Sequence, residues 1–372
     1  MSDPYGDGRT ASAATYPCGG CGARVEFAPG TNVLQCPYCG FRQEITASSR
    51  QVREIAIEDL DVLARKPVGQ LAPYTLVCQR CAASTETTET AGLCQFCGSP
   101  LVMDAAATGQ IIPEGVLPFE VDHNGIREAL GKWVSSRWFA PSAFKKVAAA
   151  ESTKGTYVPH WTFDAEAFSA YSGQQGRHYW VTENDGEGRT KRVRRTRWHH
   201  VRGEVSSGFD DVLVPASTVL PVNRVDALGP WPLPEAGPYQ RQYLAGYHAL
   251  RYDVEPENGL DEAKSRMSRE IHEECRRDIG GDEQRVERVD TDFSNITFKL
   301  MLLPVWVATY MYAGRSWQLL VNGRTGEVQG ERPWSKVKVT LAILLAVIVV
   351  AALAVLYFNG HHTGGSKTTK HH

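Results

Sequence analysis

The sequence has almost no excess of charge of either sign, because 40 lysines and arginines face 42 aspartates and glutamates, for a net charge of −2. A chain with that balance is not held on nucleic acid by its bulk charge. It also lacks a Gly-x-x-x-x-Gly-Lys-Ser/Thr loop, a Gly-x-Gly-x-x-Gly turn after a strand, a Gly-x-Ser-x-Gly elbow and a His-Glu-x-x-His helix. These absences argue against nucleotide-dependent enzymes, common hydrolases and zinc proteases.

The composition indicates a folded protein that is rich in turns. Apolar residues make up 42% and charged residues 22% of the 372 residues, which excludes global disorder. The 34 glycines and 20 prolines favour many turns and short strands over a long helical bundle. Residues 1–16 hold no apolar run, so they predict a disordered leader without a secretory signal.

One long apolar run stands near the C-terminal end of the sequence. Residues 339–358, VTLAILLAVIVVAALAVLYF, include no charged side chain. At about 1.5 Å per residue, a helix of this length spans roughly 30 Å, the thickness of the hydrocarbon layer of a bilayer. The run predicts a single transmembrane helix over 337–358 that serves as an anchor, and the alternative is a buried core helix.

The charges that flank this run predict its orientation. Arg332, Lys336 and Lys338 lie close to its N-terminal side, whereas the cations beyond it lie farther away. Positively charged flanks tend to stay in the cytoplasm. The expected location is therefore the cell membrane, single-pass, with residues 1–335 cytoplasmic and an extracytoplasmic tail over 359–372.

Eight of the nine cysteines form one pattern twice. Each half has two Cys-x-x-Cys pairs, separated by fourteen residues in the first half and by twelve in the second. The eight are Cys18, Cys21, Cys36, Cys39, Cys78, Cys81, Cys94 and Cys97. Two such pairs bring four thiolates to one ion, in the tetrahedral arrangement that Zn²⁺ prefers. The alternative is a disulfide scaffold, which a reducing cytoplasm disfavours.

The cysteine pattern predicts two zinc ribbons, over 17–45 and 73–102, joined by a linker over 46–72. Four-thiolate sites leave no coordination position open for water, so the two Zn²⁺ ions are expected to be structural. A module of about thirty residues buries too little apolar surface to fold alone, and metal binding supplies the missing stability. Tyr38 and Phe96 occupy matching places in two of the pairs and are expected to cap the small cores.

The residues from 111 to 335 predict one β-rich α+β domain. Apolar residues every four positions indicate a helix over about 260–279. Cys275 falls on its buried face and is expected to be a core thiol rather than a nucleophile. Pro-x-Trp segments recur at 159–161 and 304–306, which is weak support for two related halves.

Candidate catalytic side chains in this domain are few. Asp164 with Glu166, and Asp210 with Asp211, bring carboxylates together in the sequence, but such acids are usually solvated. His160 stands between a proline and a tryptophan and is expected to be packed in a strand. No catalytic residue is predicted, and the chain is not expected to be an enzyme.

The segment 189–202 is strongly basic. Its sequence, RTKRVRRTRWHHVR, holds seven lysines and arginines, two histidines and no acid. As a strand it would have no apolar face, so we expect it at a sheet edge or in a projecting hairpin. Its candidate contact residues are Arg192, Arg194, Arg195, Arg197, Trp198 and Arg202. Three roles stay open: protection of a sheet edge, contact with anionic lipid and, least favoured, binding of nucleic acid with Trp198 stacked on a base.

Several segments together carry a resemblance to a known group. They are the paired ribbons, LPFEVD (117–122), KWVSSRWFAPSAFKK (132–146), GTYVPHWTFDA (155–165), LLPVWVATYMYAG (302–314) and VNGRTGEVQGERPWSKVK (321–338). They resemble bacterial membrane-anchored proteins with TFIIB-type zinc ribbons, often labelled primosomal protein N′ or helicase PriA-like. Helicase activity is not expected, because the phosphate-binding loop is absent. The resemblance implies an adaptor at the inner face of the membrane, alongside envelope-stress and SPFH-type scaffold proteins.

The expected architecture is α+β, with two N-terminal zinc ribbons, a central β-rich α+β domain and one C-terminal transmembrane helix. The expected function is a membrane-anchored zinc-ribbon adaptor that binds protein partners at the cytoplasmic face of the membrane. The alternative is a nucleic-acid-binding protein, linked to transcription or replication and tethered to the membrane.

Overall fold

The computed structural model describes residues 10–14, 16–63, 65–70, 73–103, 109–136, 153–184, 190–312, 315–331 and 336–362. The architecture is a mixed α+β fold with two N-terminal four-cysteine clusters and a central β-rich domain, as the sequence predicts. Fourteen strands belong to one sheet, and three more form a small separate sheet in the first ribbon. Most of the expected leader and of the expected tail, residues 1–9 and 363–372, lies outside the described residues.

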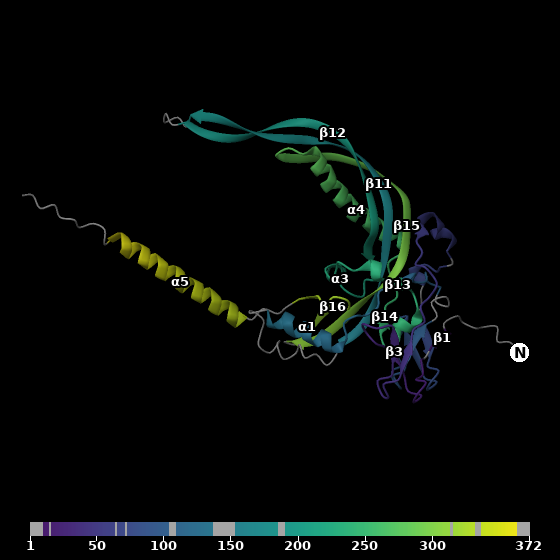
Figure 1. Ribbon diagram of the computed structural model, residues 1–372. Helices are drawn as coiled ribbons and strands as arrows, with labels where there is room; N and C mark the ends of the chain where they lie inside the picture. The colour runs from purple at the N-terminus through teal and green to yellow at the C-terminus, as the bar shows by residue number, and fades with distance from the viewer. Residues whose placement is uncertain are drawn as a thin grey trace, which may run out of the picture.

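Three long antiparallel strands dominate the central domain (Figure 1). They are β11 (Thr153–Asn184), β12 (Thr190–Pro215) and β15 (Glu283–Tyr312). β11 lies between the other two and pairs with both. The 32 residues of β11 extend over roughly 100 Å at about 3.3 Å per residue. We call the part of these strands that projects from the body the arm, and Figure 1 shows that it is curved.

Irregularities in the strand pairing accompany this curvature. The ladder between β11 and β12 shifts register between Phe163 and Ala165, and the ladder between β11 and β15 shifts between Ser172 and Gly173. An extra residue in one strand bends it and increases its local twist. The glycine and proline content predicts many short strands, whereas the structure has three long strands that continue through these irregularities.

Helix α4 (Pro256–Ile279) packs on the concave face of the arm (Figure 1). Pro256 begins the helix, where its missing N–H is not needed, and Gly280, with φ of 62°, ends it. The buried residues are Pro256, Gly259, Ala263, Met267, Ile271, Cys275 and Ile279. The predicted buried stripe is therefore confirmed, and Cys275 is a core thiol whose pKa is raised by burial.

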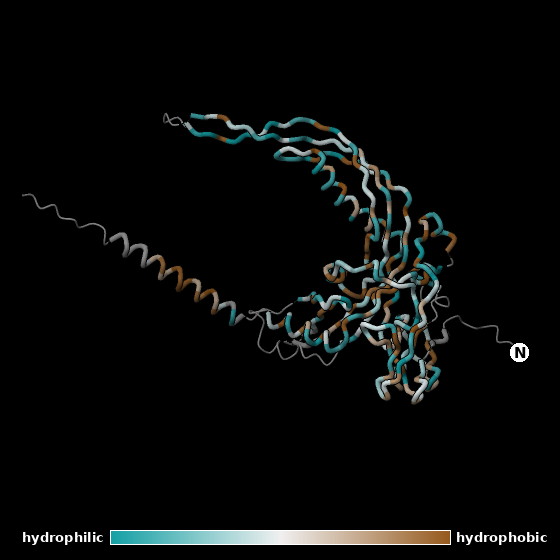
Figure 2. The backbone as a smooth tube through the Cα atoms, viewed as in Figure 1, coloured by the Kyte–Doolittle hydropathy of each residue, from teal (hydrophilic) through white to brown (hydrophobic). Residues whose placement is uncertain are grey.

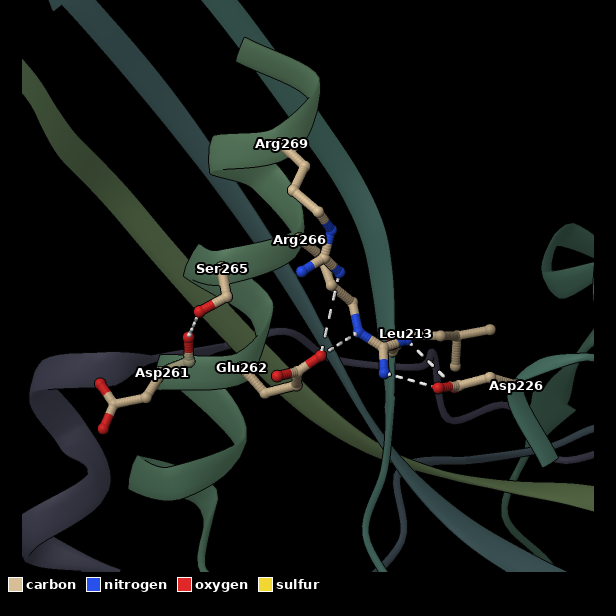
Figure 3. Close-up of polar contacts among 7 residues, drawn as sticks. All are labelled: Leu213, Asp226, Asp261, Glu262, Ser265, Arg266 and Arg269. Carbon is tan, nitrogen blue, oxygen red and sulfur yellow. Dashed lines mark hydrogen bonds and ion pairs between the residues drawn. The ribbon is translucent and has the colours of Figure 1, made fainter. Parts of the chain in front are cut away.

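Arg266 fastens α4 to two neighbouring elements (Figure 3). Its Nη1 and Nη2 donate to the two carboxylate oxygens of Asp226, at 3.1 and 2.8 Å, and Nη1 also donates to the Leu213 carbonyl at 2.7 Å. Glu262, one turn earlier, accepts from Nε at 3.0 Å. Asp226 ends the short helix α3 (Val222–Asp226), and Leu213 lies in β12. One guanidinium therefore joins α4 to α3 and to β12.

The body of the domain is built on the halves of β11 and β15 that lie away from the hairpin. Short strands extend this sheet: β5 (Ile55–Ala56), β10 (Gly115–Val116), β13 (Gly237–Pro238), β14 (His248–Ala249), β16 (Arg315–Asn322) and β17 (Val328–Gly330). An aromatic cluster forms its core. Phe119 stacks on Tyr247 with ring centroids 4.4 Å apart, and meets Tyr157 and Trp306 edge-on. These large buried rings fix the strands to the connections around them.

The two Pro-x-Trp segments are neighbours in this sheet. Tyr157 lies opposite Pro304 and Pro159 opposite Leu302, in antiparallel β11 and β15. Trp161 and Trp306 are both fully buried, in two different core clusters. The repeated motif therefore marks two paired strands that each place a tryptophan in the core.

Short helices and an added strand fill the connections. Helix α1 (His123–Ser135) is capped by Asp122, whose Oδ1 accepts from the backbone N–H groups of Asn124 and Gly125. The 3-10 helices are η1 (Ile57–Val62), η2 (Val68–Gln70), η4 (Leu233–Glu235) and η5 (Arg241–Leu244). The linker over 46–72 thus contains a strand that pairs with β15 and two helical turns.

The two ribbons lie at the end of the body away from the hairpin (Figure 1). The first consists of β2 (Glu26–Phe27), β3 (Val33–Gln35) and β4 (Arg42–Glu44). The second consists of β6 (Tyr74–Val77), β7 (Ser84–Thr87), β8 (Ala91–Leu93) and β9 (Pro100–Met103). Strand β1 (Thr10–Ala14) pairs with β6 and β9, so the leader, expected to be disordered, contributes a strand to the second ribbon.

Helix α5 (Lys336–His362) contains the apolar run (Figure 2). Its exposed large apolar side chains are Leu341, Ile343, Leu344, Leu345, Val347, Ile348, Val349, Val350 and Leu353. Within the residues that the structure describes, no helix has both the length and the apolar character needed to cross a membrane, so the span expected over 337–358 gains no support there.

Candidate functional site

The first four-cysteine cluster lies in the first ribbon. Cys18, Cys21, Cys36 and Cys39 place one sulfur each within 4.8 Å of all the others. Cys18 Sγ lies 3.5 Å from Cys39 Sγ, and Cys21 Sγ lies 3.7 Å from Cys36 Sγ. Four sulfurs held at about 2.3 Å from a central Zn²⁺ would lie about 3.8 Å apart, so the cluster has the dimensions of a zinc site.

The second cluster repeats this geometry in the second ribbon. Cys78 Sγ lies 3.6 Å from Cys97 Sγ, and Cys81 Sγ lies 3.7 Å from Cys94 Sγ. The two clusters share no residue, and all eight cysteines are free thiols. Both sets are positioned to bind metal ions, and four thiolates in a tetrahedral arrangement favour zinc. The predicted pair of separate sites is therefore confirmed at the level of the ligand geometry.

The backbone turn after each Cys-x-x-Cys pair has the same geometry. The residue after the second cysteine donates its N–H to the carbonyl of the first cysteine, at 2.8 to 3.0 Å in all four turns. That residue has positive φ in every turn: 70° at Gly22, 73° at Gly40, 66° at Gly98 and 57° at Ala82. Glycine adopts this conformation freely, whereas Ala82 adopts it against the steric preference of its Cβ. The fourth turn therefore keeps the shape despite its different residue.

The first cysteine of every pair is buried and the second faces the solvent side of the ribbon. Cys18, Cys36, Cys78 and Cys94 are buried, whereas Cys21, Cys39 and Cys81 are exposed and Cys97 is half-buried. A hydrogen bond with the Ser99 hydroxyl, 3.3 Å away, lowers the pKa of the Cys97 thiol to about 6. A thiolate is the form of cysteine that binds metal.

The first ribbon is packed into the core of the central domain. Phe27 is buried, and its ring lies 5.2 Å from that of Tyr243 in an edge-on contact. The Phe27 N–H donates to the Ala245 carbonyl at 2.8 Å, and the Tyr247 hydroxyl donates to the Phe27 carbonyl at 3.4 Å. Because of these contacts, the first metal site is structurally connected to the domain that it precedes.

The aromatic residues of the cysteine turns do not cap the ribbon cores. Tyr38 is 69% exposed and Phe96 is 72% exposed, so that prediction is wrong. The small cores are instead filled from the strands, by residues such as Leu34 in the first ribbon and Leu76 in the second. Both rings are instead exposed to solvent, in the turns at the tips of the ribbons.

Arg24 joins the two tips. Its Nη1 donates to the Gly98 carbonyl in the second ribbon at 2.5 Å, and its guanidinium lies 6.0 Å from the centre of the Tyr38 ring in the first. A Cβ at Gly98 would lie 2.5 Å from that Nη1, so a larger residue at position 98 would displace the guanidinium from its present place. A cavity of about 260 Å³ separates the ribbons beside this contact, and Gln79 and Arg80 are among its lining residues. The sequence does not predict a role for Arg24, because nothing in the residues around it indicates a contact with residue 98.

Residues 190–202 of the basic segment form the outer part of β12, where they pair with β11 in the hairpin of the arm, and position 189 lies outside the described residues. The expectation of a projecting hairpin is confirmed (Figure 1). Its six candidate contact residues, Arg192, Arg194, Arg195, Arg197, Trp198 and Arg202, fall on both faces of the ribbon. The pairing places Arg192, Arg194, Trp198 and Arg202 on one face, and Arg195 and Arg197 on the other.

A group of acidic residues lies where the linker meets the arm. Carboxylate oxygens of Glu54, Asp164 and Asp210 lie within 4.8 Å of one another. Lys299, which is almost fully buried, places Nζ 3.0 Å from Glu54 Oε1 and 2.6 Å from Asp211 Oδ1. Burial raises the pKa of Asp164 to about 6, with Glu54 adding to the effect. The group is thus a network of four carboxylates and one buried lysine that links the linker to β11, β12 and β15.

His160 is confirmed as a packed strand residue. It is buried, and its Nδ1 lies 3.0 Å from the Val158 carbonyl. Burial lowers the pKa of His160 to about 4. It is therefore neutral at physiological pH.

Comparison with known proteins finds a distant relative. A Bacillus subtilis (strain 168) protein, described as the uncharacterized protein YdjG, is 26% identical over 326 residues, which cover 87% of this chain and 92% of that protein. No protein-family model matches the chain, and no solved structure matches it. The chain is thus a distant homologue of YdjG with two four-cysteine clusters that are consistent with zinc ribbons.

Proposed function

We propose that this chain is a membrane-anchored adaptor whose two zinc ribbons bind a protein partner at the cytoplasmic face of the membrane. The observation that carries the proposal is the pair of closed four-thiolate clusters, each with an exposed aromatic side chain at its tip. A closed cluster has no position for a substrate, so its role is to hold a shape. Exposed aromatic rings on a rigid support are typical of protein-binding surfaces.

The contact made by Arg24 supports a single surface built from both ribbons. It fixes the tip that contains Tyr38 to the turn that contains Phe96. A partner would therefore meet two aromatic rings and the positive charge of the exposed Arg80 at a constant spacing. The partner class suggested by the resemblance is an SPFH-type scaffold protein of the membrane.

The exposed apolar side chains of α5 are the observation behind the membrane part of the proposal. Nine leucine, isoleucine and valine side chains between Leu341 and Leu353 are each 49 to 66% exposed. Keeping such a side chain in water rather than in an apolar environment costs about 1.5 to 3 kcal/mol. Lipid around the apolar run over 339–358 would remove this cost. Lys336 and Lys338 then favour a cytoplasmic location of the ribbons and of the central domain.

The test of this function is photocrosslinking in cells. The full chain is made with p-benzoylphenylalanine at the position of Tyr38 or of Phe96, and in a matched control at Phe168, an exposed ring on the arm. We expect the same protein adduct at the two ribbon positions, in the membrane fraction, and its absence at the control position. A chain that high salt washes from the membrane, or ribbon positions that give no common adduct, would refute the proposal.

A second candidate function is a nucleic-acid-binding protein tethered to the membrane, and it rests on the basic hairpin. The observation behind it is that Arg192, Arg194 and Trp198 share one face of a projecting ribbon. Binding of DNA or RNA oligonucleotides is measured over a series of salt concentrations. Micromolar affinity that falls steeply with salt, and is lost in Arg194/Arg195/Arg197→Gln, would establish this function.

A further inference from the structure

The outer end of the arm is a two-stranded ribbon with a strong positive charge. We define the distal ribbon as residues 177–184 of β11 and 190–197 of β12, which pair along their whole length. The pairing of β15 with β11 ends at Gly176, and in the described part of the chain no third strand joins the distal ribbon. The distal ribbon has six lysines and arginines and one glutamate, a net charge of +5 in a chain whose total is −2.

Protection of a sheet edge does not account for this charge. The outer edge of β12 lacks a further strand along its whole described length, and an edge-protecting charge would be spread along it. Residues 203–215 of the same edge include three acids, Glu204, Asp210 and Asp211, but no lysine or arginine, so the positive charge does not extend along the edge. The cations are instead concentrated where the ribbon leaves the support of β15 and α4. These cations also lower the stability of the fold, because Arg177 and Arg197 lie directly opposite each other and like charges repel.

The distal ribbon also exposes aromatic rings among its arginines. Trp180 is 59% exposed and Tyr179 is 36% exposed, on opposite faces. The guanidinium of Arg192 lies 5.5 Å from the centre of the Trp180 ring, and that of Arg197 lies 5.0 Å from the centre of the Tyr179 ring. Cations and amphipathic aromatic rings are the two side-chain classes that gather at the headgroup level of a membrane.

We propose that the distal ribbon docks on the anionic lipid headgroups of the membrane that holds α5, as a second contact between this chain and the bilayer. In Figure 1, the distal ribbon and α5 extend from the body toward the same side. The proposal rests on the membrane attachment proposed above for α5. Each basic side chain near an anionic surface strengthens binding several-fold, so the six in the ribbon make a firm but salt-sensitive contact.

The distribution of the side chains favours lipid over nucleic acid. Each face of the distal ribbon has cations and one aromatic ring. A ribbon that enters the headgroup layer meets lipid headgroups on both of its faces. Base stacking needs an aromatic face free to receive a base. Trp180 and Tyr179 each have a guanidinium over the ring, and Trp198 at the base of the ribbon has Arg285 at 3.9 Å from its ring centre.

The test uses the zinc-loaded full chain in vesicles. One set is pure phosphatidylcholine, and the other includes about 30% phosphatidylglycerol, a typical anionic fraction. The residue p-benzoylphenylalanine is placed at position 180, and in a control at position 168 in the three-stranded part of β11. Lipid adducts at position 180 should rise by about tenfold or more with phosphatidylglycerol and fall again in high salt. Adducts at position 168 should stay at the background yield.

Charge variants complete the test. Arg194/Arg195/Arg197→Gln should weaken lipid contact at position 180 on the order of a hundredfold. Arg269/Arg276/Arg277→Gln removes the same charge from exposed positions of α4 and should leave it unchanged. Equal adduct yields in the two vesicle types, or adducts to an added oligonucleotide in place of lipid, would overturn the proposal. Retention in pure phosphatidylcholine reports on α5 alone, so failure of the anchor and failure of the ribbon contact are distinguished.

Discussion

The loss of one cysteine from each cluster should have different consequences, because the two clusters are embedded differently. Cys36→Ser and Cys94→Ser each remove one buried ligand. Metal content should fall from about two zinc ions per chain to about one in both variants, since each cluster has its own four ligands. Structural zinc contributes about 10 to 16 kcal/mol, which exceeds the stability of a typical domain, so the affected ribbon should unfold.

The two substitutions should also destabilise the central domain to different extents, because the two ribbons pack on it differently. Cys36 belongs to the same hydrophobic cluster as Phe27, Tyr157 and Trp306, whereas Cys94 belongs to a small cluster of the second ribbon. The second ribbon also contributes Ala91 and Val102 to the first of these clusters, but both side chains are much smaller than that of Phe27. Unfolding of the first ribbon withdraws Phe27 from the core, and loss of a buried phenylalanine costs about 3 to 5 kcal/mol. Cys36→Ser should therefore destabilise the central domain by about that amount, and Cys94→Ser by less.

Two measurements check this prediction. Inductively coupled plasma mass spectrometry gives zinc per chain, and urea unfolding followed by tryptophan fluorescence gives the stability of the central domain. Cys275→Ala is the control, because this cysteine lies in α4 and outside both clusters, and it should keep both ions. Loss of both ions from a single substitution, or equal destabilisation by the two variants, would show that the reasoning is wrong.

Two further predictions concern the central domain. Arg266→Lys should lower the free energy of unfolding by about 1 to 2 kcal/mol, because lysine cannot reproduce the fork to Asp226, while Arg269→Lys should change it by less than about 0.5 kcal/mol in the same urea assay. The pKa of His160 is about 4 in the fold against 6.5 in a free side chain, so stability should fall by up to about 3 kcal/mol as pH drops through this interval. His160→Gln should not show this loss of stability at low pH. If the pH dependence of its stability equals that of the unmodified chain, His160 is not the group responsible.

The metal clusters were predictable from the sequence because their determinants are local. A Cys-x-x-Cys pair specifies its own turn, and two pairs suffice to complete a tetrahedral site. The buried stripe of α4 was predictable for the same reason, since a period of four residues marks one helix face. The orientations of Tyr38 and Phe96 could not be predicted, because the direction of a ring depends on whether the ribbon leaves space beneath the turn.

The arm and the polar networks depend on contacts distant in the sequence. Strand β11 continues through positions where the alternating pattern fails, because β12 and β15 hold it on both sides. Lys299 reaches Glu54 across 245 positions of sequence, and no local pattern of either residue indicates its partner. Burial of that lysine follows from its neighbours in the sheet, which only the three-dimensional structure identifies.

The bridge from Arg24 to Gly98 has a consequence for affinity. Two binding elements that are held at a fixed separation engage a two-site partner as one bivalent ligand, because the second contact forms at a high effective concentration once the first is made. Neither ribbon alone would then reproduce the avidity of the pair. A short partner peptide that reaches one tip only would bind far more weakly than a chain, or an array of identical chains, that spans both.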